Sequence, residues 1–282
     1  MMIGIQCAIM TSMSEEASEH STLRKQARNQ PPPWVPLLKR LTEISPLWGV
    51  WKNADVAIAS HGDIDSVSPR DDRDRLVDEF RLWASEHRMA PIFTCSHLPG
   101  SFLAVAVRGR ELVELQLIEK AMFRGSTLFD AQDLSSMMIM DDRKFRRLRP
   151  GAEGLLLLFH MGLRWGGRAA PEGLRRKPIA EMMRGDPEGM RAGTRVFGSA
   201  RGAALALATA VLRGNWDRGA ALHVETWAGV RGLRSPGLWL SRGRYRFSGE
   251  RYCPMLPVLR GGRWIEGDLD DWTDRTRRSH ES

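Results

Sequence analysis

The chain has 282 residues, a formal net charge of +8 and 42% hydrophobic residues. This length allows one large domain or two modest ones, with enough apolar residues for a core. The longest strongly apolar run, residues 155–159, is far shorter than the roughly 20 residues of a membrane-spanning helix. No basic segment precedes the apolar start, so a signal peptide is not expected. Three widely separated cysteines form neither a metal-binding spacing nor a disulfide framework, which favours a reducing, cytoplasmic setting.

The excess of basic residues is confined to the second half of the sequence. Residues 1–33 carry three basic and three acidic groups, residues 34–150 carry 17 of each, and residues 151–282 carry 22 basic and 14 acidic groups. This imbalance favours an anionic partner for the second half, such as a nucleotide, a nucleic acid or a phosphorylated substrate. An arginine-rich, solvated surface explains the same composition equally well.

The first half alternates between helical and strand patterns. Residues 1–33 are expected to be a polar, disordered lead that ends in three prolines. Apolar periodicity predicts a helix at 34–44, followed by strands at about 47–51 and 63–67. The next helix is expected to begin at Pro69, capped by Ser68, and to continue to about His87. Apolar periodicity and turn residues predict three further strands, at about 91–97, 101–107 and 111–118.

The second half has a helical pattern throughout. Five helices separated by glycines are expected, at residues 151–165, 172–183, 187–197, 199–212 and 218–233. The sequence therefore predicts an α+β fold. Residues 34–150 are expected to form a small mixed β-sheet domain flanked by helices, and residues 151–282 a helical domain.

Two acidic residues on the second expected strand are the main chemical signal. Strand alternation places Asp63 and Asp65 on one face and turns Ile64 into the core. Two neighbouring carboxylates are costly unless a cation neutralises them. Oxygen ligands suit Mg²⁺, and a third carboxylate from a neighbouring strand would complete a site for two-metal phosphoryl transfer. The alternative is an ordinary acidic turn before a helix.

Further motifs accompany this pair: GDID at residues 62–65, ELVELQLIE at 111–119, FRGSTLF at 123–129 and RPGAEGLLLLFHMGLRWGG at 149–167. Together they resemble the nucleotidyltransferase superfamily to which DNA polymerase β belongs, in particular small bacterial nucleotidyltransferase-like proteins. The resemblance spans about residues 47–167. It implies Mg²⁺-dependent transfer of a nucleotidyl group from a nucleoside triphosphate to a hydroxyl of a small molecule or a protein.

Carried over to this sequence, the resemblance makes Asp63 and Asp65 the catalytic pair that binds the metal. The position matching the third acid holds Gln116, whose amide lacks the charge of a carboxylate. Glu114 lies on the same face two residues earlier, nearly 7 Å away at about 3.3 Å per residue. Either Glu114 or Gln116 is thus expected to complete the site.

The superfamily usually has a Gly-Ser pair about ten residues before the acids, where it cradles the triphosphate. Here the corresponding stretch is VWKNADVAIASHGDID, residues 50–65, which has no such pair. Lys52 and Asn53 are therefore expected to contact phosphate, as a point charge and a hydrogen-bond donor. Arg124 follows the acidic strand and is expected either to reach the same phosphate or to pair with Glu114 or Asp130.

Two alternatives to catalysis stay open. One is a non-catalytic descendant that senses a nucleotide or binds a partner, and the other is nucleic-acid binding through the basic second half. The five basic residues within positions 143–149 either grip a phosphate or an anionic polymer, or form a solvated linker between domains. Tryptophans of the second half either stack on bases or belong to the core, and His160 is expected to be a core histidine.

Overall fold

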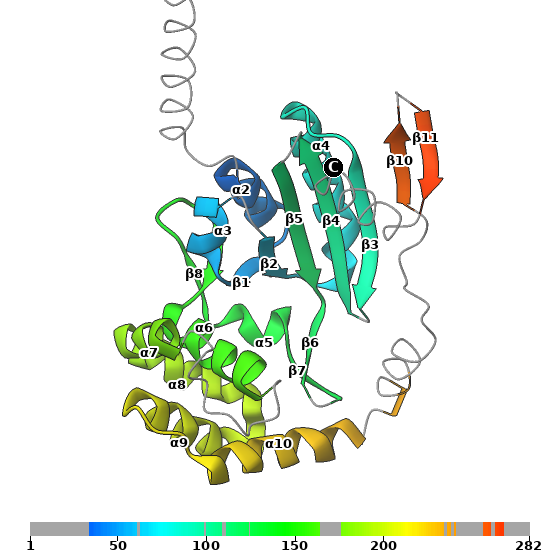
Figure 1. Ribbon diagram of the computed structural model, residues 1–282. Coiled ribbons are helices and arrows are strands. Elements are labelled where there is room, and N and C mark those ends of the chain that lie inside the picture. Colours follow the sequence, from blue (N-terminus) through cyan, green and yellow to red (C-terminus); the bar gives the residue numbers. More distant parts are fainter. Residues whose placement is uncertain are drawn as a thin grey trace, which may run out of the picture.

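The computed structural model describes residues 34–60, 63–98, 100–108, 111–123, 125–163, 176–233, 236–237, 240, 256–260 and 263–267. The fold is mixed α+β and contains a seven-stranded mixed sheet with the strand order β3-β4-β5-β2-β1-β9-β8 (Figure 1). This confirms the α+β class that the sequence predicts.

The strands of the large sheet are β1 (Gly49–Lys52), β2 (Asp63–Val67), β3 (Ile92–Leu98), β4 (Ser101–Arg108), β5 (Glu111–Ile118), β8 (Met138–Met140) and β9 (Arg146–Leu148). Strand β2 lies at its centre, parallel to β5 and antiparallel to β1. Two hairpins are separate from this sheet: β6 (Lys120–Phe123) with β7 (Ser126–Asp130), and β10 (Leu256–Arg260) with β11 (Arg263–Gly267).

The α-helices are α2 (Trp34–Ile44), α3 (Ala54–Ser60), α4 (Arg73–Glu86), α5 (Ala131–Ser135), α6 (Pro150–Leu157), α7 (Arg176–Gly185), α8 (Pro187–Gly193), α9 (Arg201–Leu212) and α10 (Arg218–Leu233). Two 3₁₀ segments, η1 (Arg70–Asp72) and η3 (Thr194–Ala200), and one π-helical segment, η2 (Leu158–Leu163), adjoin them. The expected helices at 34–44 and 218–233 and the expected strand at 63–67 have the observed bounds.

One face of the sheet is covered by α2 and α4 (Figure 1). Alternation along β5 turns Val113, Leu115 and Leu117 toward this core, as expected. Apolar residues three and four apart along α4, among them Phe80 and Trp83, supply the helix side of the same core. The polar residues that alternate with them along β2 and β5 consequently belong to the opposite face.

The opposite face meets a second hydrophobic cluster at one end of the central strands. There, Trp51 and Val67 join the hydrophobic cluster of the helices that follow residue 150. Val67 is the last residue of β2, so the first residue, Asp63, lies at the other end, beyond this cluster. Among the described residues of this end of β2, Asp63 is exposed and Asp65 is buried.

The start of α4 differs from the expected one. Ser68 is fully buried at the end of β2, and its Oγ has no hydrogen-bond partner among the described residues. The chain passes through the 3₁₀ turn η1 before α4 begins at Arg73, and neither start has a side-chain cap. The predicted Ser68 cap is therefore wrong, because the preceding strand turns this side chain inward, and Asp72 accepts a hydrogen bond from Ser45 Oγ instead.

Several short elements were not expected from the sequence. Helix α3 fills the connection between β1 and β2, and the β6–β7 hairpin leads into α5. Asp130 and Asp133 form a reciprocal capping box at the start of α5, a local signal that the sequence does contain. Strands β8 and β9 extend the sheet beyond β1. The β10–β11 hairpin lies within the range for which only helices were predicted.

The 26-residue run from Pro187 to Leu212 is long and apolar enough to cross a membrane by length and composition. Core helices pass the same test, and this run contains α8, η3 and α9, whose Phe197 and Leu207 are fully buried in the protein. Gly198 has a φ of 52° and marks a kink inside it.

A tight contact between α6 and α8 leads to a stability prediction. A Cβ atom on Gly151 would overlap the backbone carbonyl of Asp186 and lie 2.5 Å from the backbone nitrogen of Met190. Backbone atoms cannot rotate away as a flexible side chain would, so Gly151→Ala is expected to lower the free energy of unfolding by about 1–3 kcal/mol. Urea denaturation followed by circular dichroism measures this loss.

Gly229→Ala is the matched control, because Gly229 lies within α10 and a Cβ there meets no atom within 4 Å. This substitution is expected to stabilise the protein by up to about 1 kcal/mol through helix propensity. Equal effects of the two substitutions would contradict the close packing of α6 against α8.

Candidate functional site

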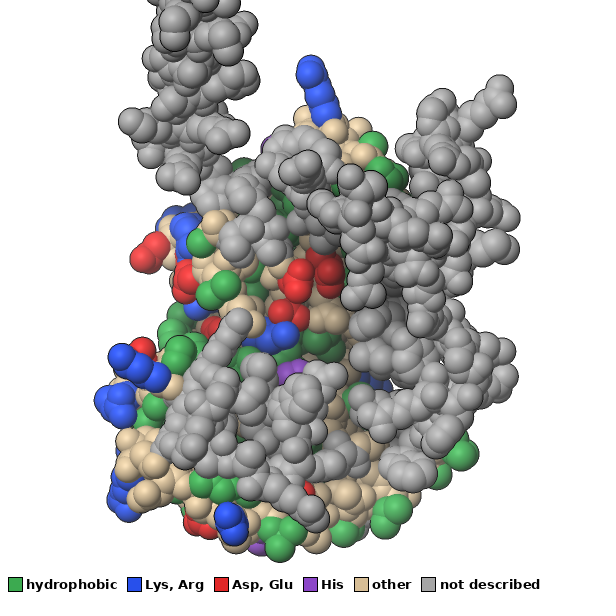
Figure 2. Space-filling model, viewed as in Figure 1, with side chains coloured by type: hydrophobic (Ala, Val, Ile, Leu, Met, Phe, Trp, Pro, Cys, Tyr) green, Lys and Arg blue, Asp and Glu red, His purple; other side chains and the backbone are tan. Residues whose placement is uncertain are grey.

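The parallel pairing of β2 with β5 brings the predicted acidic residues together. The register places Asp63 opposite Glu114 and Asp65 opposite Gln116. Asp63 is exposed at the start of β2, Asp65 is 6% exposed, and Glu114 is partly buried. Figure 2 shows acidic side chains gathered near the centre of one face of the protein, with a basic side chain below them.

Electrostatics show that these three carboxylates influence one another. Burial, followed by the charges of Asp63 and Asp65, raises the pKa of Glu114 to about 7. Burial also raises the pKa of Asp65, and the charge of Asp63 adds to this rise. Three carboxylates therefore share a region in which their negative charge is not fully compensated.

Lys52 is the cation of this region. Its register partner across the β1–β2 pair is Asp65, and its Nζ lies 2.9 Å from Asp65 Oδ2. The same ammonium lies 5.3 Å from the centre of the Trp51 ring, within the range of a cation–π interaction. This pairing lowers the pKa of Asp65, but burial has the larger effect. The structure thus places Lys52, which was predicted to contact phosphate, on one of the acids.

Gln116 lies beside Asp65 in the register but makes a different contact. Its Nε2 donates a hydrogen bond of 3.2 Å to Ser101 Oγ on the neighbouring strand β4. Its backbone carbonyl accepts a bond of 2.8 Å from Ser66 Oγ. Of the two residues considered for the third position, Glu114 is therefore the one whose charge acts on the acidic pair.

Asn53 lies in the turn directly after Lys52 and has a φ of 55°, in the left-handed region. Its backbone N–H donates a 2.6 Å hydrogen bond to Glu153 Oε1 on α6. Glu153 is only 3% exposed, and its Oε2 lies 3.5 Å from the guanidinium of Arg147. A buried carboxylate from the second half of the chain thus holds the turn that follows Lys52.

Arg147 is the centre of a larger ion-pair network. Its guanidinium lies 2.7 Å from Asp55 Oδ2 and 3.4 Å from Asp141 Oδ2. Arg143 pairs with the same two aspartates and holds the pKa of Asp141 at about 2. The network joins α3, β9 and α6.

The basic run at residues 143–149 is thus largely paired within the chain. Beyond the network around Arg147, Arg149 lies 2.7 Å from Asp186 and 2.9 Å from Glu188. Arg146 donates a hydrogen bond to the carbonyl of Pro46. These contacts join the sheet to α8 and the loop after α2, which is a structural use of residues that were also candidates for binding phosphate.

Some predicted residues lie outside the described part of the chain. These are Arg124, His61 and Gly62. His160 is described: it lies in the π-helical segment η2, and its ring packs edge-on against Trp51 at 5.5 Å between centroids. Among the tryptophans of the second half that are described, Trp216 and Trp227 pack against the hydrophobic cluster of the helices.

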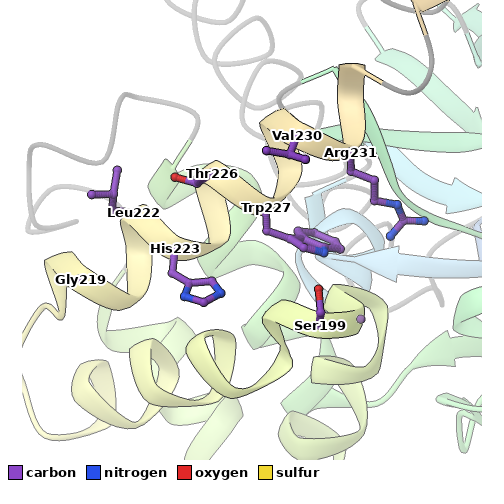
Figure 3. Close-up of a pocket in the computed structure, with 9 residues that line it drawn as sticks. Ser199, Gly219, Leu222, His223, Thr226, Trp227, Val230 and Arg231 are labelled. Atoms are coloured by element: carbon purple, nitrogen blue, oxygen red, sulfur yellow. The ribbon is translucent and has the colours of Figure 1, made fainter.

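A separate cavity of about 770 Å³ lies along α10. Figure 3 shows Trp227 and His223 pointing from α10 toward the side of Ser199, while Leu222 and Val230 lie on the other side of the helix. None of the acidic residues of β2 and β5 lines it. The cavity therefore belongs to the helical half and not to the acidic site.

The donor set of the acidic site suits a hard divalent cation. All three groups supply carboxylate oxygens, and the single charge of Lys52 does not balance them. Within the described residues, no three or more His, Cys, Asp or Glu side chains are already grouped closely enough to hold a metal ion. Lys52 Nζ lies beside Asp65 Oδ2 in this region.

Comparisons with known proteins found no match to this chain. No family model matches the sequence, and neither the curated proteins nor the solved structures contain a match.

Sequence reasoning missed the network around Glu153 and Arg147. Glu153 is a lone acid in the apolar run PGAEGLLLL, and such a residue in a helix that becomes buried needs a partner. That signal was present, but its partners Asn53 and Arg147 are distant in sequence and only the tertiary fold reveals them.

Proposed function

We propose that this protein is a nucleotidyltransferase, which transfers a nucleotidyl group from a nucleoside triphosphate to a hydroxyl of a small molecule or a protein, with Mg²⁺. The observation that carries the proposal is the register of β2 with β5, which puts Glu114 opposite Asp63 and so adds a third carboxylate to the Asp63–Asp65 pair. The nucleotidyltransferase arrangement of the α+β fold is part of the same proposal.

In this proposal Asp63, Asp65 and Glu114 hold Mg²⁺ through their carboxylate oxygens. The bound ion would supply positive charge to the phosphate oxygens and lower the pKa of the acceptor hydroxyl. In the same proposal, Lys52 would attract the triphosphate as a point charge. Without a cation, Glu114 holds a proton in about half of the molecules near pH 7, because its pKa is about 7.

Asp63→Asn tests the proposal. Asp63 is exposed at the end of a strand, so the amide is expected to fold normally. Removing one negative ligand is expected to weaken Mg²⁺-dependent binding of a nucleoside triphosphate at least tenfold, as measured by isothermal titration calorimetry with ATP, GTP, CTP and UTP in turn.

Asp78→Asn is the matched control, since Asp78 is an exposed aspartate on α4, the helix that covers the opposite face of the sheet. It is expected to bind nucleotide like the wild-type protein. The proposal would be wrong if the wild-type protein bound none of the four nucleotides with Mg²⁺, or if Asp63→Asn bound them unchanged.

A second candidate is a non-catalytic protein that senses a nucleotide. Gln116 favours it, because this amide stands opposite Asp65 and is directed to Ser101. Nucleotide binding that Asp63→Asn weakens, without transfer to any hydroxyl, would select this candidate over the enzyme. Arg143, Arg147 and Arg149, which were candidates for gripping a phosphate or an anionic polymer, are paired with carboxylates of the chain itself.

A further inference from the structure

The contact between Lys52 and Asp65 combines two groups with opposite roles in the proposed reaction. Asp65 is a proposed metal ligand, and Lys52 is the nearest candidate for holding phosphate. In the structure, Lys52 Nζ lies 2.9 Å from Asp65 Oδ2, and both side chains are largely shielded from water. Their pairing is also fixed by the β1–β2 register, in which the two residues are partners.

An ammonium in this place obstructs a metal ion in two ways. It occupies a lone pair of Oδ2, whereas Mg²⁺ binds carboxylate oxygens at about 2.0–2.1 Å. It also repels a divalent cation that approaches the neighbouring oxygens, and this repulsion is strong because the site is partly buried. The same carboxylates without the lysine would be a stronger cation site.

A triphosphate group offers the ammonium another partner. It carries more negative charge than one carboxylate, and lysine binds phosphate as a point charge that needs no fixed geometry. The Lys52 side chain is long and rotatable, it stands at the last residue of β1 before α3, and it is 21% exposed. Movement of Nζ from Asp65 to a phosphate would free Oδ2 at the moment when the nucleotide arrives.

We propose that Lys52 is a tethered cation that occupies the metal position at Asp65 until a triphosphate draws it away, so that the metal and the nucleotide load together. This inference rests on the proposed function, since it requires that the acidic residues bind a divalent ion. It assigns Lys52 a part in the order of binding in addition to contact with phosphate.

The test measures metal and phosphate separately on the full chain. In the first titration, the electron paramagnetic resonance signal of free Mn²⁺ reports metal binding without nucleotide. Lys52→Met is expected to bind Mn²⁺ at least tenfold more tightly than the wild-type protein. In the second, calorimetry measures inorganic tripolyphosphate binding in EDTA, and Lys52→Met is expected to bind at least tenfold more weakly.

Lys177→Met is the control for loss of one positive charge, because Lys177 is exposed on α7. It is expected to behave like the wild-type protein in both titrations. Adding Asp65→Asn to Lys52→Met is expected to abolish the gain in Mn²⁺ affinity. If Lys52→Met does not fold, Lys52→Gln serves in the same titrations. In the wild-type protein, the ¹⁵N resonance of Lys52 Nζ must also shift when tripolyphosphate is added.

The possible outcomes distinguish a failure of the tethered-cation inference from a failure of the proposed metal-dependent function. Equal Mn²⁺ affinity of the wild-type protein and Lys52→Met would overturn the tethered cation and leave the metal site standing. Unchanged tripolyphosphate binding, or a Nζ resonance that does not shift, would overturn the coupling of metal to nucleotide. Absence of Mn²⁺ binding by both proteins would overturn the inference and the proposed metal-dependent function together.

Discussion

Replacing Arg147 by Met is expected to lower the free energy of unfolding by about 3–5 kcal/mol at pH 8. The guanidinium contacts Glu153, Asp55 and Asp141, and the Glu153 side chain is only 4% exposed. Without Arg147, Glu153 keeps one hydrogen bond from the backbone of Asn53 but loses its ion-pair partner. A buried carboxylate without a counter-charge is among the costliest defects in a protein interior.

The pH dependence of this loss has a definite sign. Burial already raises the pKa of Glu153, and Arg147 counteracts that rise. In the variant, Glu153 is expected to take up a proton more readily as the pH falls, which removes the buried charge. The destabilisation measured by urea denaturation is therefore expected to shrink between pH 8 and pH 5.

Two further variants test whether the unpaired charge of Glu153 causes the loss of stability in Arg147→Met. Adding Glu153→Gln to Arg147→Met is expected to recover part of the lost stability, because the amide is neutral and its oxygen still accepts the Asn53 N–H. Arg143→Met is the matched control: it removes a more exposed arginine of the same network, with an expected cost of at most about 1 kcal/mol. A loss for Arg147→Met no larger than the control's would contradict the structural role of Arg147.

Replacing Glu114 by Gln is expected to stabilise the protein at pH 8 by about 3 kcal/mol in the absence of divalent ions. The pKa of Glu114 is raised from 4.5 to about 7, and each pKa unit corresponds to about 1.4 kcal/mol. Because the folded protein binds more protons than the unfolded chain between these two values, its free energy of unfolding falls as the pH rises from about 4.5 to 7. Gln116, the neighbouring amide, shows that this face of β5 accommodates a neutral side chain.

The expected signature is a difference that depends on pH. Near pH 4.5 and below, Glu114 is protonated in the folded protein and the two proteins are expected to unfold at similar urea concentrations. The variant's advantage then grows up to about pH 7 and stays level. If Glu114 belongs to the proposed metal site, addition of Mg²⁺ is expected to stabilise the wild-type protein more than the variant, since the ion would replace the proton as the partner of the carboxylate. A stability difference that does not change with pH would contradict the shared charge of Glu114, Asp63 and Asp65.

Local patterns in the sequence predicted the longer elements between residues 34 and 118, but not α3 or the short elements that follow β5. The alternation of Val113, Leu115 and Leu117 identified both the strand and its buried face, because a pleated strand exposes its two sides with a period of two residues. The spacing of Leu76, Phe80 and Trp83 did the same for α4. The Ser68 cap failed because capping depends on which way a side chain turns at the end of a buried strand.

The acidic site was predicted in part. Placement of Asp63 and Asp65 on one face follows from strand alternation alone. The choice between Glu114 and Gln116 does not, since it depends on how far β5 is shifted along β2. The observed register sets Glu114 opposite Asp63. A shift of two residues would have put Gln116 there with the same residues on the same face.

The sequence by itself determined the α+β class, the position of the acidic pair and the reason why two carboxylates on one strand face need a cation. Only the tertiary structure shows that the ammonium of Lys52 is the cation beside Asp65. Lys52 and Asp65 are 13 positions apart, and they meet because β1 pairs with β2 across a bulge, at 2.9 Å between Nζ and Oδ2. Such a contact is set by strand register and burial, which are properties of the folded chain and of no single segment.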